Sequence, residues 1–422
     1  MAEVPVVVIT GLGCVSPQGR GVAKLWSGLL EGRTAFRPVT LFDASMFRNP
    51  LAGVVEGYPA VAPADAGAGA TRAARMLVDA ADEALRDALG LPPVVGQAGQ
   101  PAPPGIAAAV AAGGALARAA IVTGTNFGGM SAAETALTHG AGDISKASLA
   151  QYLFGAPARA LARSFGIAGP RLNLSLSCAS GTAAIGLACD MIRRGRAEAA
   201  LACGFDELSL FIYAGLSALR AMTPDTVRPF DKRRKGTLFS EGAGVLVLES
   251  AAHAAARKAP RIYARVLGRA MNNDAYHMTA PEQEAHGIQA LLRAVLADAQ
   301  VAPEAIEHLN LHATGTPYND AIETKAVHAV FGARGREIPV GAVKSSIGHC
   351  MGAAGTIEAA VAVLTLREGK VPPILGLDPA EKDPACDLLT PTGKPLHGNF
   401  RIVLKSSYGF GGTNAAVVLA QP

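Results

Sequence analysis

Residues 172–189 read LNLSLSCASGTAAIGLAC and indicate a strand, a sharp turn and a helix made of small residues. The run Leu172–Leu176 alternates apolar and polar side chains, which is typical of a strand. Ser180 and Gly181 permit a tight turn and let a ligand approach the backbone closely. The sequence therefore predicts that Cys178 lies between the end of a strand and the start of a helix.

Cys178 is a candidate nucleophile because of this position. The N-terminus of a helix carries the positive end of the helix dipole, which favours a thiolate and its attack on a thioester. A small buried hydrophobic residue is the commoner role of cysteine, and it describes Cys189 and Cys203. The small neighbours Ser180 and Gly181 favour the functional interpretation of Cys178.

Short β-branched runs recur along the chain and alternate with longer Ala-rich segments that favour helix. These runs are Val6–Ile9, Ile121–Thr123, Leu172–Leu176, Val245–Leu248, Leu309–Leu311 and Ile338–Val343. The alternation predicts an α/β protein whose mixed sheets are covered by helices on both faces. The stretch Leu91–Pro104 is rich in Pro, Gly and Gln and is interpreted as a surface connection before a soft helix within Ile106–Ala120.

The two halves of the chain share sequence features. TGTNF at 123–127 is similar to TGTPY at 314–318, and SCASG at 177–181 aligns with GHCMG at 348–352. The two offsets, 191 (315 minus 124) and 171 (349 minus 178), differ by about one short element. A duplicated α/β half with unequal insertions explains them, and chance similarity of Gly- and Ala-rich strings is the alternative. If the two halves arose by duplication, Cys178 and His349 occupy equivalent turns and meet near a pseudo-twofold axis.

Two further turns carry histidine. His312 ends a predicted strand and precedes Thr314 and Thr316, a pattern suited to a polar ligand, although a capped core histidine is the simpler interpretation. The stretch KSSIGHCMGAAG at 344–355 places His349 in a turn before a helix of small residues.

Lys344 ends a predicted buried strand and needs a partner there. Glu358 and a catalytic imidazole are the candidates, because a buried ammonium is stable only when it is paired. A purely structural salt bridge between Lys344 and Glu358 is an equally good interpretation.

The glycine-rich loop YGFGGTN at 408–414 places three glycines around Phe410. Such a loop can direct backbone N–H groups inward and form half of an oxyanion hole, with Phe410 as a wall or gate. A plain β-turn is the alternative.

Composition narrows the class of protein. A chain of 422 residues predicts two fused domains around a large core, and 17% charged residues indicate a globular protein. A net charge of +4 is too small to imply nucleic acid but permits an acidic partner. With neither a membrane-spanning stretch nor a signal peptide in view, we expect a cytoplasmic location. Six scattered cysteines without a CxxC pair predict free thiols and no structural metal.

Together these motifs resemble the elongating β-ketoacyl-ACP synthases. SCASG, HATGTPYND, VKSSIGHCMGAAG and SYGFGGTN occur in that order and spacing, as do VITGLGCVSPQG, RPFDKRRKGTLFSEGAG and NNDAYHMTAP. The resemblance covers nearly the whole chain and is specific for the family, but it leaves the pathway open between fatty acid and polyketide or polyene synthesis.

This resemblance implies a thiolase-like fold of five layers (α-β-α-β-α) built from two βαβαβαββ halves. We expect the N-terminal half over residues 1–258, with a cap insertion at about 25–117, and the C-terminal half over 259–422. Members of the family are normally homodimers. Pairing with a related ketosynthase-like subunit is the other arrangement that the resemblance allows.

The resemblance also implies the catalytic roles. Cys178 would accept the acyl chain from acyl-ACP as a thioester. His312 and His349 would hydrogen-bond the malonyl thioester carbonyl and promote loss of CO2, and the resulting carbanion would attack the acyl-Cys. The backbone amides of Cys178 and Phe410 would hold the oxyanion.

Supporting residues follow from the same motifs. Lys344 and Glu358 would support the histidines, whereas the substrate would contact Thr314, Thr316, Phe410 and Asn414. Neither a metal nor a cofactor is required, because the substrates are carried on the phosphopantetheine of the acyl carrier protein. This acidic partner would dock on basic clusters, for which we select Arg72, Arg75, Lys232 and Arg233, within the run 232–235, although a solvated face is the simpler interpretation of such clusters.

Three residues depart from the usual family pattern. Ala313 stands where Gly is usual, Tyr408 where Phe is common, and Ser240 where Gly precedes Glu241. These changes affect the expected shape of the pocket more than the expected reaction.

Other classes of protein fit less well. A thiolase-type acyltransferase needs a second cysteine in the C-terminal loop, where this chain has Phe410. Chain-starting and chalcone-type synthases use a Cys-His-Asn set. A non-catalytic chain-length-factor subunit is the main alternative, but Cys178 is retained. A cysteine hydrolase needs a group that activates water, and none is evident.

Overall fold

The computed structural model describes residues 4–58, 71–93, 106–112, 116–138 and 150–422. Most of the predicted connection Leu91–Pro104 lies outside these residues. Within the predicted soft helix, the structure describes α3 (Ile106–Ala112), while residues 113–115 lie outside the described residues and β5 begins at Ala120.

Ten strands form the two sets that organise the fold. The first set comprises β1 (Val7–Ser16), β5 (Ala120–Gly124), β6 (Arg171–Leu174), β7 (Ala199–Asp206) and β8 (Gly242–Ser250). The second comprises β9 (Ala264–Asn273), β10 (His308–Asn310), β11 (Val340–Gly341), β14 (Ile402–Gly409) and β15 (Thr413–Ala420).

The two sets have the same topology. Their spatial orders are β6-β5-β7-β8-β1 and β11-β10-β14-β15-β9, so each reads third, second, fourth, fifth, first in chain order. In both sets the second strand is parallel to the third and fourth, and the remaining pairs are antiparallel. This agreement supports the predicted duplication. The sets join where Val7–Ile9 of β1 pairs with β9.

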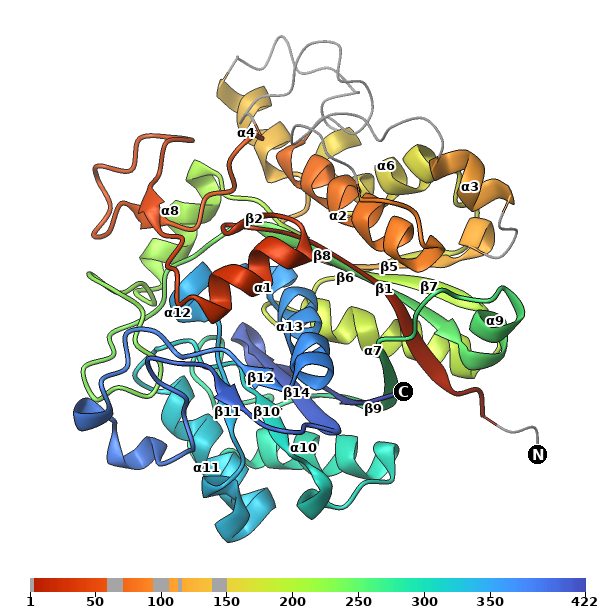
Figure 1. The fold of residues 1–422 in the computed structure, drawn as a ribbon. Helices are drawn as coiled ribbons and strands as arrows, with labels where there is room; N and C mark the ends of the chain where they lie inside the picture. Colours follow the sequence, from red (N-terminus) through yellow and green to blue (C-terminus); the bar gives the residue numbers. More distant parts are fainter. Residues whose placement is uncertain (1–3, 59–70, 94–105, 113–115, 139–149) are drawn as a thin grey trace.

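Helices form three layers around these strands (Figure 1). One outer layer contains α2 (Arg72–Leu89), α3 and α6 (Ala156–Phe165), and the other contains α10 (His286–Ala299) and α11 (Asn319–Phe331). The central layer consists of α7 (Ser180–Arg193) and α13 (Ala354–Glu368), which pack on strands of both sets. The predicted five-layer α/β fold is therefore confirmed.

The remaining elements are short. The other helices are α1 (Val22–Leu30), α4 (Met130–Thr138), α8 (Leu210–Ala218), α9 (Ala251–Ala256) and α12 (Lys344–Ile347). Two-residue strands are β2 (Gly19–Arg20), β3 (Arg37–Pro38), β4 (Leu51–Ala52), β12 (Lys370–Val371) and β13 (Leu396–His397).

Small residues allow the central layer to pack closely. A Cβ atom at Gly181 of α7 would lie 2.7 Å from the carbonyl oxygen of Gly352, and one at Gly204 of β7 would lie 2.5 Å from Thr356 Oγ1. Both separations are too short for side-chain carbon, so glycine is required. This close packing brings the start of α7, next to Cys178, against the turn that carries His349.

The boundary predicted at residue 258 stays a prediction. It falls between the last strand of the first set and the first strand of the second. The six cysteines are free, as predicted, and all six are buried. Within the ranges that the structure describes, no helix has the length and apolar character needed to cross a bilayer.

Candidate active site

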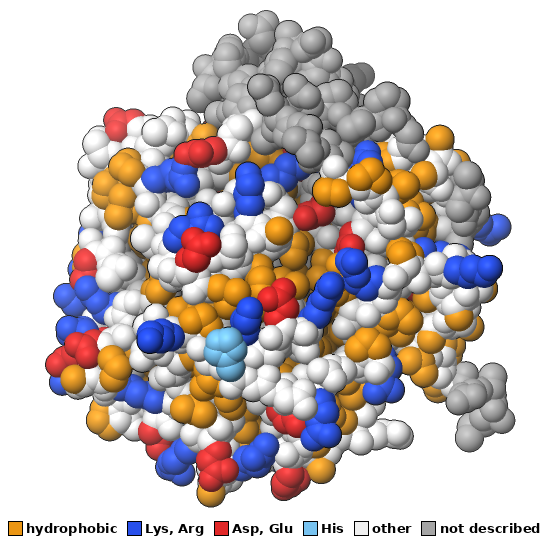
Figure 2. All heavy atoms as spheres, in the orientation of Figure 1, with side chains coloured by type: hydrophobic (Ala, Val, Ile, Leu, Met, Phe, Trp, Pro, Cys, Tyr) orange, Lys and Arg blue, Asp and Glu red, His pale blue; other side chains and the backbone are white. Residues whose placement is uncertain are grey.

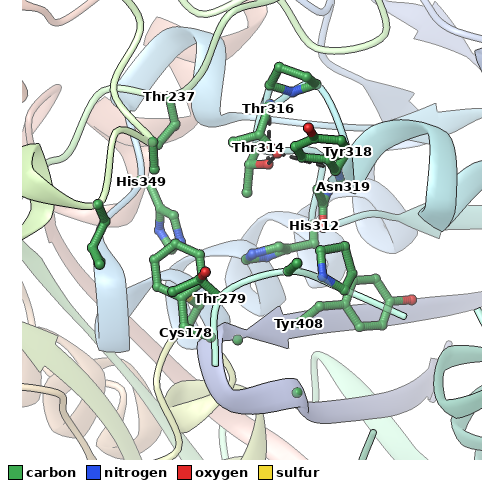
Figure 3. Close-up of a pocket in the computed structure, with 18 of the residues that line it drawn as sticks. Cys178, Thr237, Thr279, His312, Thr314, Thr316, Tyr318, Asn319, His349 and Tyr408 are labelled. Atoms are coloured by element: carbon green, nitrogen blue, oxygen red, sulfur yellow. Dashed lines mark hydrogen bonds between the residues drawn. The ribbon is translucent and has the colours of Figure 1, made fainter. Parts of the chain in front are cut away.

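One pocket contains the three residues that the sequence places in turns. Cys178, His312 and His349 line it together with Thr314 and Thr316 (Figure 3). The sulfur and a nitrogen from each imidazole all lie within 4.8 Å of one another. The predicted meeting of Cys178 and His349 is therefore confirmed.

A strained turn positions Cys178. Ser177 has φ of 49°, in the left-handed region that non-glycine residues seldom adopt. Ser180 stabilises the turn, because its Oγ accepts a hydrogen bond from the Leu176 N–H at 2.8 Å and donates to the Ser177 carbonyl at 2.7 Å. The thiol therefore faces the pocket immediately before α7 begins.

Burial dominates the ionisation of Cys178. It raises the pKa of the thiol to about 11, against the opposing effects of the Lys344 charge and of hydrogen bonds from backbone N–H groups. The resting side chain is therefore a thiol at neutral pH, in contrast to the thiolate expected from its position at a helix N-terminus. Its proton must leave as the acyl group arrives.

Two backbone N–H groups converge on the sulfur. They belong to Cys178 itself and to Phe410 in the glycine-rich loop. Gly411 and Gly412 have φ of 82° and 73°, and a Cβ at Gly409 would lie 3.0 Å from the Cys178 nitrogen. This loop therefore needs its glycines to approach the cysteine, and its N–H group is placed to stabilise an oxyanion on a carbonyl attached to Cys178.

His349 is held with its proton on Nε2. Its Nδ1 accepts a hydrogen bond from the Met351 N–H at 3.1 Å, so Nδ1 carries no proton. Its Nε2 is buried and has no hydrogen-bond partner among the described residues. The ring also stacks on Phe239, with centroids 5.8 Å apart. His349 therefore presents one unused N–H donor.

Charged residues likewise fix the proton of His312 on Nε2. Its Nδ1 lies 3.3 Å from Lys344 Nζ, and its backbone N–H donates to Glu323 Oε1 at 2.7 Å. An ammonium facing Nδ1 leaves the proton on Nε2. The rings of His312 and His349 are 5.2 Å apart and nearly perpendicular. Figure 3 shows both imidazoles directed toward the space above Cys178.

Both imidazoles are neutral. Burial is the main cause that lowers the pKa of His312 and of His349 well below the ordinary value, and the positive charge of Lys344 adds to it. The pocket therefore holds two neutral Nε2–H donors at neutral pH.

These tautomers bear on metal binding. Cys178, His312 and His349 have the residue types and spacing of a metal site. Ligation through Nε2 would require the proton on Nδ1, where Lys344 and the Met351 N–H already donate. The histidines are therefore arranged as hydrogen-bond donors.

Lys344 contacts both of the partners considered from the sequence. It is hydrogen-bonded to Glu358, and it donates to the His312 carbonyl at 2.6 Å. Lys344 and Glu358 are buried, so the pair is shielded from solvent. The contact with His312 shows that this salt bridge is part of the pocket's framework.

The predicted substrate-binding residues also line the pocket. Thr314 Oγ1 and Thr316 Oγ1 are hydrogen-bonded to each other at 2.9 Å, and Phe410 and Asn414 also line the pocket. The Asn414 amide is already engaged, because it donates to Asp274 Oδ1 at 2.6 Å. Contacts of these four residues with a substrate stay predictions.

Ala313 occupies a conformation that suits glycine. Its φ is 40°, in the left-handed region where an L side chain is strained. This explains why glycine is the expected residue there. The Glu323 carboxylate compensates, because it accepts from the Ala313 N–H at 2.8 Å as well as from His312.

Sequence reasoning missed three buried residues that organise the pocket: Glu323, Asp206 and Lys405. Asp206 accepts from Thr125 Oγ1 at 2.6 Å and from the Gly352 N–H at 2.7 Å, so it joins turns of both halves. Glu323 and Thr324 follow TGTPY as Glu134 and Thr135 follow TGTNF, so this part of the internal repeat was a usable signal. Asp206 and Lys405 lie within strands, and no pattern in the sequence indicated their role.

The structure corrects one predicted docking residue. Arg72 is 1% exposed and donates to Glu241 Oε2 at 2.7 Å from inside the fold, so its selection as a docking residue was wrong. Lys232 and Arg233 are exposed and lie near the acidic side chain of Glu381. Docking of a carrier protein at Lys232, Arg233 and the partly buried Arg75 stays a prediction.

Replacing Arg72 by methionine is expected to destabilise the protein. The change leaves the fully buried Glu241 carboxylate without its main cation, which costs about 3–5 kcal/mol in unfolding free energy. The loss is measured by urea unfolding. Adding Glu241→Gln should recover much of it, and a single variant as stable as the wild type would contradict this assignment.

A buried cysteine, two backbone N–H groups and two histidine N–H donors around one pocket are the parts of an acyl-transfer site. Comparison with known proteins agrees. The family described as "Beta-ketoacyl synthase, N-terminal domain" matches residues 5–254, and "Beta-ketoacyl synthase, C-terminal domain" matches residues 263–378. The chain belongs to the β-ketoacyl synthase family, as predicted.

Individual relatives match over their whole length. The 3-oxoacyl-[acyl-carrier-protein] synthase 2 of Coxiella burnetii is 33% identical, covering 98% of both chains. The ishigamide ketosynthase/chain length factor structure has a TM-score of 0.86 at 33% identity over 100% of both chains. A type II polyketide synthase acyl-carrier protein complex with its ketosynthase bound to the hexaketide has a TM-score of 0.86 at 27% identity, also covering 100% of both chains.

Proposed function

We propose that this chain is a 3-oxoacyl-ACP synthase, which condenses a Cys178-bound acyl chain with malonyl-ACP. The observation that carries the proposal is the convergence of the Cys178 thiol with the Nε2–H groups of His312 and His349 in one pocket. The family match and the similarity to a named 3-oxoacyl-[acyl-carrier-protein] synthase support it.

Acylation is the first step. The sulfur of Cys178 attacks the thioester carbonyl of acyl-ACP, and the N–H groups of Cys178 and Phe410 stabilise the oxyanion. The bond to the carrier thiol then breaks. Its sulfur takes up the proton that Cys178 loses, and the acyl chain remains on Cys178 as a new thioester.

Decarboxylation follows with malonyl-ACP in the pocket. The two Nε2–H groups donate to the malonyl thioester oxygen, so negative charge can develop there as the bond to the carboxylate breaks and CO2 leaves. The electron pair of that bond forms an enolate. Because both imidazoles are neutral donors, this step needs no metal and no cofactor in our proposal.

Condensation completes the cycle. The enolate carbon attacks the carbonyl of the acyl-Cys178 thioester, and the same two amide N–H groups hold the second oxyanion. The bond from the acyl carbon to Cys178 sulfur breaks, and the thiolate takes up a proton from water. The product is a 3-oxoacyl-ACP that is longer by the two carbons kept from malonate.

A direct test of this function uses malonyl-ACP labelled with ¹³C in the carboxylate. With an acyl-ACP present, we expect labelled CO2 and unlabelled 3-oxoacyl-ACP in equal amounts. Comparing donors of different chain lengths would distinguish fatty acid from polyketide or polyene pathways. Failure with every donor would favour a partner subunit without its own activity.

Carrier-protein binding is the second part of the proposal. Two exposed cations, Arg220 and Lys235, line the pocket, so they lie where the phosphopantetheine of an acidic carrier protein would enter. One similar structure contains such a carrier protein with its ketosynthase. Charges of both signs are interspersed on the face of the molecule shown in Figure 2.

Reversing both rim charges, Arg220→Glu with Lys235→Glu, is expected to raise KM for acyl-ACP by about tenfold at low salt and by less at high salt. Steady-state kinetics at two salt concentrations measure this. Lys394→Glu is the control, because Lys394 is exposed but does not line the pocket. An equal rise in that control, or no rise in the double variant, would move the docking site elsewhere.

Assembly with a second subunit is also proposed. Strand β6 is the outermost strand of its sheet, and its Leu172 is exposed, so another chain can pair along this edge. A homodimer and a pair with a related subunit both fit this edge. One similar structure is described as a ketosynthase with a chain length factor. A cytoplasmic location remains part of the proposal.

A further inference from the structure

Lys405 is a buried cation that the steps above do not use. It lies in β14 and is 0% exposed. Its Nζ lies 2.8 Å from Glu358 Oε2, donates to Ser407 Oγ at 2.9 Å and also donates to the Ser406 carbonyl. A buried ammonium is costly unless it is paired, so these partners indicate what Lys405 acts on.

One set of contacts leads from Lys405 to a catalytic imidazole. Glu358 lies between two ammonium groups, with Oε1 bonded to Lys344 and Oε2 facing Lys405. Lys344 in turn faces His312 Nδ1. Because each carboxylate oxygen faces an ammonium group, the orientation of Glu358 is fixed. Glu358 in turn fixes the position of the Lys344 ammonium, which selects the tautomer of His312.

A second set of contacts leads to the nucleophile. Ser407 Oγ, which accepts from Lys405, is also hydrogen-bonded to Thr182 Oγ1 at 2.9 Å. Thr182 lies in the first turn of α7, the helix that begins just after Cys178. Lys405 is thus connected to the histidine side and to the cysteine side of the pocket.

We propose that Lys405 is a positioning residue, which holds Glu358 and Lys344 in place behind His312 and joins them to the helix that follows Cys178. It does not line the pocket, so it acts through these residues and touches no substrate. The inference rests on the proposed role of the two histidines as donors.

The charge of Lys405 also favours neutral imidazoles. Charged or titratable groups face it from three helices, namely Glu358 of α13, Lys344 of α12 and Glu323 of α11. Burial and Lys344 are the larger causes that lower the pKa of both histidines, and Lys405 adds to them. Removing this positive charge should therefore raise the pKa of His312 and of His349.

Protonation would disturb the donors. A proton on Nδ1 of either ring competes with the hydrogen that Lys344 or the Met351 N–H directs there, so the ring must move. The rate of decarboxylation should accordingly fall on the acid side, and the midpoint of that fall reports the imidazole pKa.

The test measures kcat/KM for malonyl-ACP decarboxylation against pH in Lys405→Met, which keeps side-chain length without charge. We expect the acid-side midpoint to move to higher pH by about one unit. Leu404→Ala is the matched control, because Leu404 is the buried neighbour on the other face of β14. It should lower stability and leave the midpoint unchanged.

If Lys405→Met alone fails to fold, a second pair of variants tests the same prediction. In Glu358→Gln the carboxylate is already neutral, so adding Lys405→Met leaves no new unpaired charge. The double variant should again show a higher midpoint than Glu358→Gln alone. The proposal is overturned if Lys405→Met leaves the acid-side midpoint unchanged in a background that folds, whether wild type or Glu358→Gln.

The test separates this proposal from the proposed function. A wild-type protein that never decarboxylates malonyl-ACP would contradict the function. The effect of Lys405 would then be read from NMR titration of His312 and His349 in the same variants. A pKa that does not rise without Lys405 would overturn the positioning role by itself.

Discussion

Replacing Cys178 by alanine is expected to abolish condensation, with a loss of at least about 10⁴-fold, and to leave the fold intact. In the proposed mechanism the thiol holds the acyl chain, and the two N–H groups that would stabilise the oxyanion are directed at its sulfur. Acyl transfer from acyl-ACP and formation of 3-oxoacyl-ACP are the two quantities to measure.

Cys189→Ala provides the matched control for this prediction. Cys189 is a buried thiol in α7, the helix that follows Cys178, but it does not line the pocket. We expect it to retain acylation and condensation. Malonyl decarboxylation should persist in Cys178→Ala, because the histidine donors do not depend on the sulfur. Condensation by Cys178→Ala at an appreciable rate would remove Cys178 as nucleophile.

The second large effect is expected for His349→Ala, which should reduce malonyl decarboxylation by about 10²- to 10³-fold and acylation of Cys178 much less. In the proposed mechanism the Nε2–H of His349 is one of two donors to the developing negative charge, and this atom has no other partner among the described residues. Acylation would instead rely on the N–H groups of Cys178 and Phe410. Single-turnover assays of the two half-reactions separate them.

His308→Ala controls for the loss of a buried imidazole. His308 lies in β10, is hydrogen-bonded to the Pro339 carbonyl at 2.9 Å and packs against Phe400, away from the pocket. We expect lower stability with both half-reactions retained. If His349→Ala slows acylation as much as decarboxylation, its assigned role is wrong.

Much of the fold was predictable because its strands carry β-branched runs. Val245–Leu248 and Ile121–Thr123 lie within the observed strands β8 and β5. Strand β7, with the sequence AALACGFD, gave no such signal. At Gly204 a side chain is excluded by close packing against the central layer, and this requirement is visible only once both halves are folded together.

The three central residues of the site were predictable, whereas its buried charges were not. Cys178 and His312 follow strands, and His349 follows the short helix α12. All three stand beside small residues or hydroxyls, and the internal repeat indicated that two of them meet. Lys405 sits in an apolar strand, where its neighbours favour a core position. Its partner Glu358 lies on a distant helix, so only the folded structure reveals the pair. For Arg72 the prediction failed in the opposite direction. Its basic cluster in the sequence indicated a surface position, whereas the side chain is buried.

We propose that Cys178 carries the acyl chain and passes it to a decarboxylated malonyl unit. Intact-protein mass spectrometry after incubation with acyl-ACP, and again after malonyl-ACP is added, tests it most directly. We expect a thioester adduct that maps to Cys178 and disappears on addition of malonyl-ACP as 3-oxoacyl-ACP and CO2 form. An adduct on another residue, or none with any acyl donor, would contradict it.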